Sequence, residues 1–240
     1  MSQRFVSHIL DLLIVIRDPI FLKRLLWVGI LIVIMLVSIL ININFLNNNF
    51  PNPPRPPDRF LDWIPQNRDF VQYGEYFSRT LIFIVFLTFA TSAERLQRFP
   101  KLMFLLCVMF TLRGFAITLT PLAQITPPSE YLPKSNFIAQ QFYHGMFYSG
   151  HISSALIQAF FFWDDRYKET RITWFMLPLV FAQAISMLIS HQHYSIDIFG
   201  AFFVAYFMLN FNFMKLVPAS LLDLKWMPWA IPGEENSIRS

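Results

Sequence analysis

The fold is decided by uninterrupted apolar stretches, the first of which is Leu-Leu-Trp-Val-Gly-Ile-Leu-Ile-Val-Ile-Met-Leu-Val-Ser-Ile-Leu-Ile-Asn-Ile-Asn-Phe at Leu25–Phe45. This stretch holds no charged residue. A helix needs about 20 mostly apolar residues to cross the hydrocarbon core of a bilayer. Further, largely apolar stretches follow along the 240-residue chain, at Tyr76–Ala93, Leu102–Leu122, Met146–Trp163, Ile172–Ser190 and Ile196–Val217. The pattern predicts an all-α integral membrane protein with about six transmembrane helices.

Composition supports this class of protein. The chain is 55% hydrophobic and 14% charged, whereas soluble domains carry about 25% charged residues. The net charge is +4, but the basic residues lie between the apolar stretches, which excludes a basic face for nucleic acid. The single cysteine, Cys107, lies inside an apolar stretch and cannot form an intramolecular disulfide. Asp11, Arg17 and Asp18 interrupt the N-terminal run, so we expect an uncleaved signal anchor.

Three regions are expected along the chain. Residues 1–24 form an amphipathic segment at the membrane surface, 25–217 a six-helix catalytic domain, and 218–240 a cytoplasmic tail. The segment Asn47–Tyr73 contains six prolines, five of them clustered within 51–57, and is expected to be an extended loop. An even number of spans places both termini on one side, where thirteen basic residues gather against five on the other. The positive-inside rule then puts the termini in the cytoplasm.

Two polar segments at the ends of apolar stretches carry the candidate chemistry. They are His144–His151, which enters the fourth helix, and His191–Asp197, which joins the fifth helix to the sixth. Four of the five histidines of the chain lie in these segments. Ionisable groups at membrane depth are costly and mark functional sites by default. Both segments open to the non-cytoplasmic face in the predicted topology.

The helices should bring the two segments to one level of the membrane. The fourth helix descends from His151 to a polar turn at Asp164–Arg171, and the fifth helix returns over a similar length to Ser190. Arg113 lies within the third apolar stretch, roughly 18 Å above Lys101 at the rise of an α-helix. We therefore expect Arg113, His151 and His193 to share one site.

The residue types fit phosphoryl transfer. His193 and Asp197 are four positions apart and would face the same way on a helical turn. A carboxylate on one ring nitrogen orients the imidazole and activates the other nitrogen as a nucleophile or base. His151 across the site can act as acid and then base. Arg113 can bind phosphate oxygens, and the amides around Ser149 and Gly150 at a helix start form an anion cradle.

Less specific interpretations exist for single residues. His151 or His193 alone could be an interface residue that bonds to the backbone, and Arg113 could be a structural cation. Tyr148 and Tyr194 are typical of membrane-interface aromatics. His144 and His191 are expected to support the site or to lie in its loops. The combination of His151, His193 and Asp197 favours a catalytic site over these separate interpretations.

These residues resemble the lipid phosphatase and phosphotransferase (PAP2) superfamily. Ser149-Gly150-His151, followed by His193 and Asp197, is similar to its catalytic motifs. The chain more closely resembles the sphingomyelin synthase branch in two further places, Pro56–Asp62 and Arg113–Pro121, and the likeness covers roughly residues 50–215. The resemblance implies a six-helix bundle in which His193 attacks phosphorus and His151 acts as acid and then base. It implies transfer of a phosphoalcohol headgroup from a glycerophospholipid to ceramide or a related lipid alcohol, without a metal or other cofactor.

Departures from the family pattern leave the substrate open. The branch has Cys-Gly-Asp where this chain has His144-Gly145-Met146, and an acidic residue where it has Gln192. Gln192, His191 and Tyr194 are expected near the headgroup or in support of the site. The phosphatase branch has a Ser-Arg pair where this chain has Ser186-Met187, which favours a transferase.

Two other functions remain open: a PAP2-type lipid phosphate phosphatase, and a non-catalytic lipid-binding or lipid-transport protein on the same scaffold. The expected partners are membrane lipids, either ceramide-like or diacylglycerol-like beside the glycerophospholipid, and the sequence is compatible with a homo-oligomer. The membrane could be a bacterial inner membrane or a Golgi or ER membrane.

Overall fold

The chain is helical throughout most of the part that the structure, a computed structural model, describes. The described residues are 2–123, 125, 148–163 and 170–210. Over these ranges the regular elements are α-helices and one short 3-10 helix, with no strand. The predicted all-α class is therefore confirmed for this part of the chain. His144, all but the first residue of the expected loop Ile125–Lys134, residues 164–169 of the expected turn Asp164–Arg171, and the expected tail 218–240 lie outside the described residues.

The N-terminal helices meet at a sharp break. Helix α1 covers Ser2–Arg17 and helix α2 covers Pro19–Asn49. Asp18 caps α2, because its Oδ1 accepts the Ile20 amide at 3.0 Å, and Pro19 occupies the first helical position, where no amide is needed. The segment expected to end at residue 24 is thus divided at Asp18, and its last six residues begin the long apolar helix.

A loop and two antiparallel helices follow α2. The proline-rich loop contains the 3-10 helix η1 at Leu61–Trp63 and leads into α3, Phe70–Ala90. Helix α4 covers Ala93–Leu119 and includes Pro100. It begins well before the apolar stretch predicted from Leu102, because hydropathy marks the part of a helix that suits a membrane and not its whole length. The charged segment Glu94–Lys101 is its first turns.

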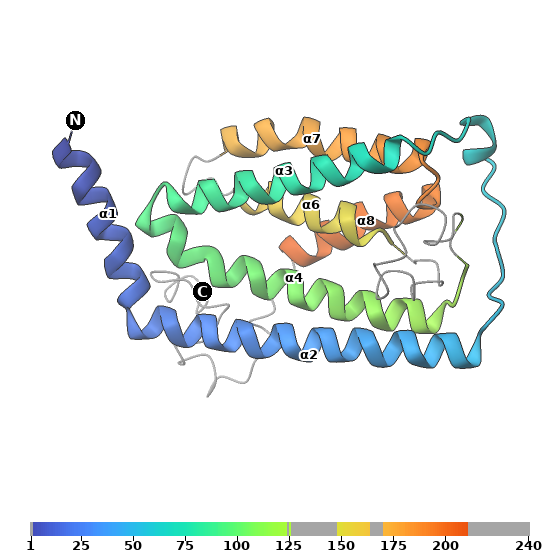
Figure 1. The fold of residues 1–240 in the computed structure, drawn as a ribbon, viewed down its shortest axis with the longest axis horizontal. Helices are drawn as coiled ribbons and strands as arrows, with labels where there is room; N and C mark the ends of the chain where they lie inside the picture. Colours follow the sequence, from blue (N-terminus) through green and yellow to red (C-terminus); the bar gives the residue numbers. More distant parts are fainter. Residues whose placement is uncertain (1, 124, 126–147, 164–169, 211–240) are drawn as a thin grey trace.

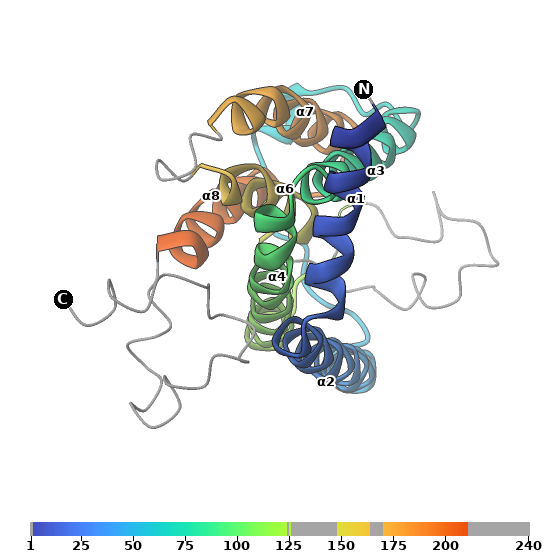
Figure 2. The same ribbon diagram turned by 90° about the vertical axis from the view of Figure 1, so that its left-hand side faces the viewer.

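Three helices complete the described chain. Helix α6 covers Gly150–Phe161, α7 covers Thr170–Ile189, and α8 covers Ser195–Asn210. Figure 1 shows that α3, α4, α6, α7 and α8 form an antiparallel bundle, so the starts of α6 and α8 lie at the same end as the loop that follows α2. In the end view of Figure 2, α2 lies at the edge of the bundle beside α4.

Helix α2 packs against α4 at Gly114. A Cβ at this position would come 2.7 Å from Nδ2 of Asn42 in α2, so a larger residue here would require the Asn42 side chain to move. On the other side of α4, a continuous apolar core joins α3, α4, α6, α7 and α8, with Met109, Ile152, Ile157 and Met176 fully buried. Nine of the twelve residues of the central helix α6 are buried. The candidate site therefore stands at the end of a rigid, packed bundle.

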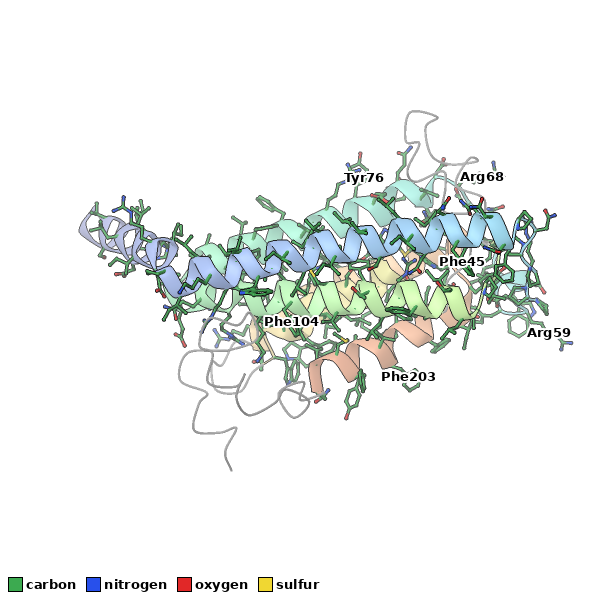
Figure 3. The ribbon with its side chains drawn as sticks, turned by 90° about the horizontal axis from the view of Figure 1, so that it is seen from below. Phe45, Arg59, Arg68, Tyr76, Phe104 and Phe203 are labelled. Atoms are coloured by element: carbon green, nitrogen blue, oxygen red, sulfur yellow. The ribbon has the colours of Figure 1, made fainter. Side chains whose placement is uncertain are left out.

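The outer surface of the bundle suits a lipid environment. Large apolar side chains are exposed along every long helix, among them Phe203 at 76%, which stands out from α8 in Figure 3. Helices α2, α4 and α7 are each long and apolar enough to cross a bilayer, and α8 is apolar but shorter over the described range. Soluble proteins rarely expose so much contiguous apolar surface. These helices indicate a membrane protein, while six spans remain a prediction.

Candidate active site

The two polar segments singled out in the sequence meet at the starts of α6 and α8. The backbone amide of Ser149 donates to the carbonyl oxygen of Asp197 at 2.9 Å. This bond joins the residue that caps α6 to the first turn of α8. It brings together His151, His193 and Asp197, the residues that the sequence assigns to catalysis, although α7 separates the two segments in the chain (Figure 1).

The start of α6 offers two backbone amides to an anion. Ser149 is the N-cap, and its Oγ accepts the amide of Ile152 at 3.3 Å. Gly150 and His151 occupy the first two helical positions, whose amides have no intrahelical acceptor. The amide of Ser149 is already engaged by Asp197, so the predicted phosphate cradle is narrower than expected. Gly150 and His151 can supply it, together with the positive end of the α6 dipole.

His193 and Asp197 are close, but not for the predicted reason. Helix α8 begins at Ser195, so His193 lies in the preceding turn and the two residues do not share a helical turn. The Asp197 carboxylate folds back instead, and its Oδ2 accepts the amide of Tyr194, the residue before the helix, at 3.2 Å. A carboxylate at the third helical position commonly caps a helix start in this way. The cap points Asp197 toward His193.

The geometry suits His193 as a nucleophile, with Asp197 to orient its ring and His151 to transfer protons. Nδ1 of His193 lies 3.5 Å from Oδ2 of Asp197, within ion-pair range but not aligned as a hydrogen bond. Both side chains are 3% exposed. The rings of His151 and His193 lie with centroids 6.2 Å apart, and His151 is exposed while His193 is buried. Because Nδ1 faces Asp197, Nε2 is the nitrogen of His193 left for a substrate.

Arg113 reaches the start of α6 from α4, as predicted. Its Nε donates to the Tyr148 carbonyl oxygen at 3.3 Å, and the Tyr148 hydroxyl donates back to the Met109 carbonyl oxygen at 2.7 Å. A Cβ on Gly150 would approach Nε of Arg113 to 3.0 Å and its Cδ to 3.1 Å. Glycine at this position thus lets the guanidinium group lie directly against the amide cradle.

The turn between α7 and α8 is held by specific bonds. His191 has a left-handed backbone with φ of 55°, which is uncommon for a residue other than glycine, and its Nε2 bonds to the Ile64 carbonyl oxygen at 2.9 Å. Oε1 of Gln192 accepts the Ser190 hydroxyl at 3.3 Å and points toward Gly74 in α3. His191 and Gln192 therefore support the turn, and a headgroup contact by either residue stays a prediction.

Two tyrosines are not the interface aromatics that the sequence indicated. Tyr148 is 3% exposed and Tyr194 is 4% exposed. The Tyr194 hydroxyl donates to the Ala123 carbonyl oxygen at 2.9 Å, and burial, with the neighbouring Asp197 carboxylate, raises the pKa of Tyr194. The hydroxyl therefore remains a donor. Both tyrosines fix backbone segments that flank the site, a role that composition cannot distinguish from an interface position.

A groove of about 400 Å³ leads away from the site between α3, α4 and α6. Its walls are mostly apolar and include Phe86, Phe99, Met103, Leu106 and Phe110. Arg113, Gly150 and His151 line its polar end. Gln158, which was not among the residues predicted for the site, also lines the groove. It is 7% exposed, and its Oε1 has no partner among the described residues. The only sequence feature that could have pointed to Gln158 is its position as a lone amide side chain in an apolar stretch.

The described residues around His151 and His193 contain no cluster of metal-ligating side chains. The described ranges contain no group of three histidine, cysteine, aspartate or glutamate side chains that could hold a metal ion. The reaction without a metal thus stays a prediction that rests on the family resemblance.

Comparison with known families agrees with the geometry. Residues 145–214 match the family described as PAP2 superfamily C-terminal. The matched range contains Ser149, Gly150, His151, His193 and Asp197 and ends just beyond the described part of α8. It supports the PAP2 superfamily, whose activities are phosphatase and phosphotransferase reactions, without distinguishing the sphingomyelin synthase branch. No curated protein matches the chain at a significant level.

Proposed function

We propose that this chain is a lipid phosphotransferase that moves a phosphoalcohol headgroup from a glycerophospholipid to a lipid alcohol such as ceramide. The observation that carries the proposal is the buried His193–Asp197 pair facing His151 at the start of α6. The site lies at the non-cytoplasmic end of the bundle in the proposed topology, with both termini in the cytoplasm. The substrates would enter from the lipid phase.

In the first half of the reaction, Nε2 of His193 attacks the phosphorus of the donor lipid. The bond between phosphorus and the diacylglycerol oxygen breaks, and protonated His151 gives its proton to that oxygen. The products are diacylglycerol and a phosphoalcohol group bonded to His193. Arg113 and the amides of Gly150 and His151 would stabilise the phosphate oxygens as charge shifts onto them, and Asp197 would stabilise the positive charge that forms on His193.

In the second half, His151 removes the proton from the hydroxyl of the acceptor lipid. The alkoxide oxygen attacks phosphorus, the bond between phosphorus and nitrogen breaks, and His193 returns to its neutral form. His151 is then protonated again, ready for the next donor. Burial of His193 and Asp197 favours a lipid hydroxyl over water as acceptor, because it limits access of water to the intermediate.

The groove between α3, α4 and α6 supports a lipid substrate. Its walls are mostly apolar, and Arg113, Gly150 and His151 line its polar end. An acyl or sphingoid chain in this groove would place its polar end at the two histidines. Pockets that bind small ligands combine apolar walls with a few polar groups in the same manner.

Gln158 favours an acceptor with a hydrogen-bond donor besides its reacting hydroxyl. Its buried amide oxygen has no partner among the described residues, and the amide N–H or second hydroxyl of a ceramide-like lipid could supply one. We expect Gln158→Leu to reduce the preference for ceramide over diacylglycerol as acceptor by roughly 2- to 10-fold, the value of one buried hydrogen bond. The measurement is competition between the two acceptors in liposomes.

Gln183 provides a matched control for this prediction. It is also buried, and its Oε1 also has no partner among the described residues, but it does not line the groove. Both leucine variants should be at least as stable to heat as the wild type, because each removes an unpaired buried oxygen. Equal acceptor preference in Gln158→Leu and Gln183→Leu would contradict the proposed contact.

The function as a whole is tested by incubating purified protein in liposomes with a panel of phospholipids and a fluorescent ceramide. We expect a new phospho-ceramide that is absent with His193→Gln, and mass spectrometry would identify its headgroup. Free phosphate from phosphatidic acid would instead establish the phosphatase. Diacylglycerol with a free phosphoalcohol would indicate a hydrolase that uses water. No His193-dependent product from any lipid would favour the non-catalytic, lipid-binding alternative.

A further inference from the structure

The start of α8 is capped from a distant part of the chain. The residue before the helix is Tyr194, whose side chain cannot accept a bond from the first turn. Asp58 takes this role across 137 positions: its Oδ2 accepts the Ser195 amide at 2.6 Å, and its Oδ1 accepts the Ser195 hydroxyl at 3.0 Å. Helix starts need such acceptors, because their first amides have no intrahelical partner. Two carboxylates, Asp58 and Asp197, therefore fix the first turn of α8.

Asp58 is itself held in place before it meets α8. Its Oδ1 also accepts the amides of Phe60 and Leu61 at 3.1 and 3.3 Å. Pro56 and Pro57 precede it and restrict the backbone on that side. An aspartate that accepts local amides in a turn has little freedom to rotate. The carboxylate is thus oriented by its own loop and presents a preformed acceptor to Ser195.

The surrounding loop follows the whole turn between α7 and α8. We define residues 54–67 as the strap. The Asn67 amide donates to the Ile189 carbonyl oxygen at 2.9 Å, and the Ile64 carbonyl oxygen bonds to the His191 ring at 2.9 Å. At its other end, the Pro54 carbonyl oxygen accepts the Ala123 amide at 3.0 Å, and Ala123 in turn accepts the Tyr194 hydroxyl. Figure 1 shows the strap at the end of the bundle where α8 begins.

From these contacts we propose that Asp58 is a positioning residue for His193. Ser195, which it binds, stands midway between His193 and Asp197, so a shift of Ser195 alters the distance and angle of that pair. The strap also holds His191 in its left-handed conformation. We expect the backbone of His191 to leave this conformation once the contacts of the strap with the turn are lost. Asp58 touches neither phosphate nor the reacting nitrogen in this account. It acts through Ser195, and the inference rests on the proposed role of His193 in catalysis.

The test compares Asp58→Ala with Asp62→Ala, which removes an exposed carboxylate from the same strap. We expect Asp58→Ala to lower kcat for the His193-dependent product by roughly 10- to 100-fold, as for other small misplacements of a reacting group. The KM for donor lipid should change by less than about threefold, because phosphate and chain contacts remain. Asp58→Asn, which keeps one oxygen acceptor, should recover part of the loss, and Asp62→Ala should retain the wild-type kcat.

Hydrogen–deuterium exchange provides a readout that does not depend on activity. In Asp58→Ala, amides of the segment 189–197 should exchange at least about tenfold faster, while those of α4 and α7 stay protected. If exchange is faster in Asp58→Ala but the wild-type protein has no activity, the proposed function is refuted and the capping role of Asp58 stands. Wild-type exchange and wild-type kcat in Asp58→Ala would overturn the inference, as would a loss of kcat without faster exchange. If Asp58→Ala does not fold, the same comparison is made with Asp58→Asn.

Discussion

Replacing His193 with glutamine should abolish formation of the lipid product, with a loss of kcat of about 10⁴-fold or more. The reason is that Nε2 of His193 is the atom that would bond to phosphorus, and no other described side chain in the site combines burial with an aspartate partner. Glutamine keeps a similar volume and an amide that can face Asp197, so the bundle should remain folded. The measurement is product formation by mass spectrometry under single-turnover conditions.

A distant histidine supplies the control for this variant. His8 in α1 bonds through its ring to the Ala90 carbonyl oxygen. Helix α1 lies at the opposite end of the bundle from the starts of α6 and α8 (Figure 1). His8→Gln should keep kcat within about twofold, since it contacts no part of the reacting groups. Turnover by His193→Gln above a tenth of the wild-type rate would exclude a covalent role for His193, whichever lipid is the substrate.

Replacing Arg113 with leucine should lower kcat/KM for the donor by about 10²- to 10³-fold, the usual effect of removing one strong donor to a developing anion. The guanidinium group lies against Gly150 at the amide cradle and belongs to the one arginine or lysine among the described residues that line the groove between α3, α4 and α6. Arg113→Lys should restore only part of the loss, because lysine keeps the charge but not the bidentate geometry. The measurement is the concentration dependence of transfer in liposomes.

Arg79 is a matched control on a neighbouring helix. It pairs with Glu75 at 3.7 Å on the surface of α3, where its side chain is 74% exposed. Arg79→Leu should leave kcat/KM within about twofold, as surface ion pairs contribute little. Equal losses in Arg113→Leu and Arg79→Leu would mean that the effect arises from charge at the membrane surface and not from the phosphate cradle.

The sequence predicted helix bounds best where the apolar stretch and the helix have the same length. The expected stretch Ile172–Ser190 agrees closely with α7 at Thr170–Ile189. Two other apolar stretches were shorter than their helices, because α4 begins at Ala93, among charged residues, and α2 begins at Pro19, ahead of Lys23 and Arg24. The predicted stretch Met146–Trp163 was longer than its helix, because α6 covers only Gly150–Phe161. Hydropathy reports which part of a helix tolerates lipid, whereas helix ends are set by caps and prolines such as Asp18 and Pro19.

The composition of the site was predictable, but the way the chain builds it was not. Spacing indicated that His193 and Asp197 would be close, and their side chains do lie within ion-pair range. The cause is a turn capped by Asp197, not a shared helical face, because α8 starts only at Ser195. A four-residue spacing alone cannot distinguish these two geometries. The sequence likewise could not show that the Ser149 amide is bonded to the Asp197 carbonyl oxygen and is therefore not available to phosphate.

Contacts between segments far apart in the chain could not be predicted from the sequence. The motif Pro56–Asp62 was recognised as a resemblance without a role, since nothing local shows that Asp58 would meet Ser195 across 137 positions. Burial of Tyr148 and Tyr194 was likewise hidden, because an interface tyrosine and a buried tyrosine have the same sequence signature. Gln158 stood in an apolar stretch, and only the structure shows that this residue lines a groove.

The central claim is that the headgroup rests on His193 between donor and acceptor. The most direct measurement is to mix purified protein with donor phospholipid in the absence of acceptor, quench without acid, and map the modified peptide by mass spectrometry. We expect a phosphoalcohol group on His193, which is lost when ceramide is added and never forms in His193→Gln. Steady product formation with no modification of His193, or modification of His151 instead, would contradict it.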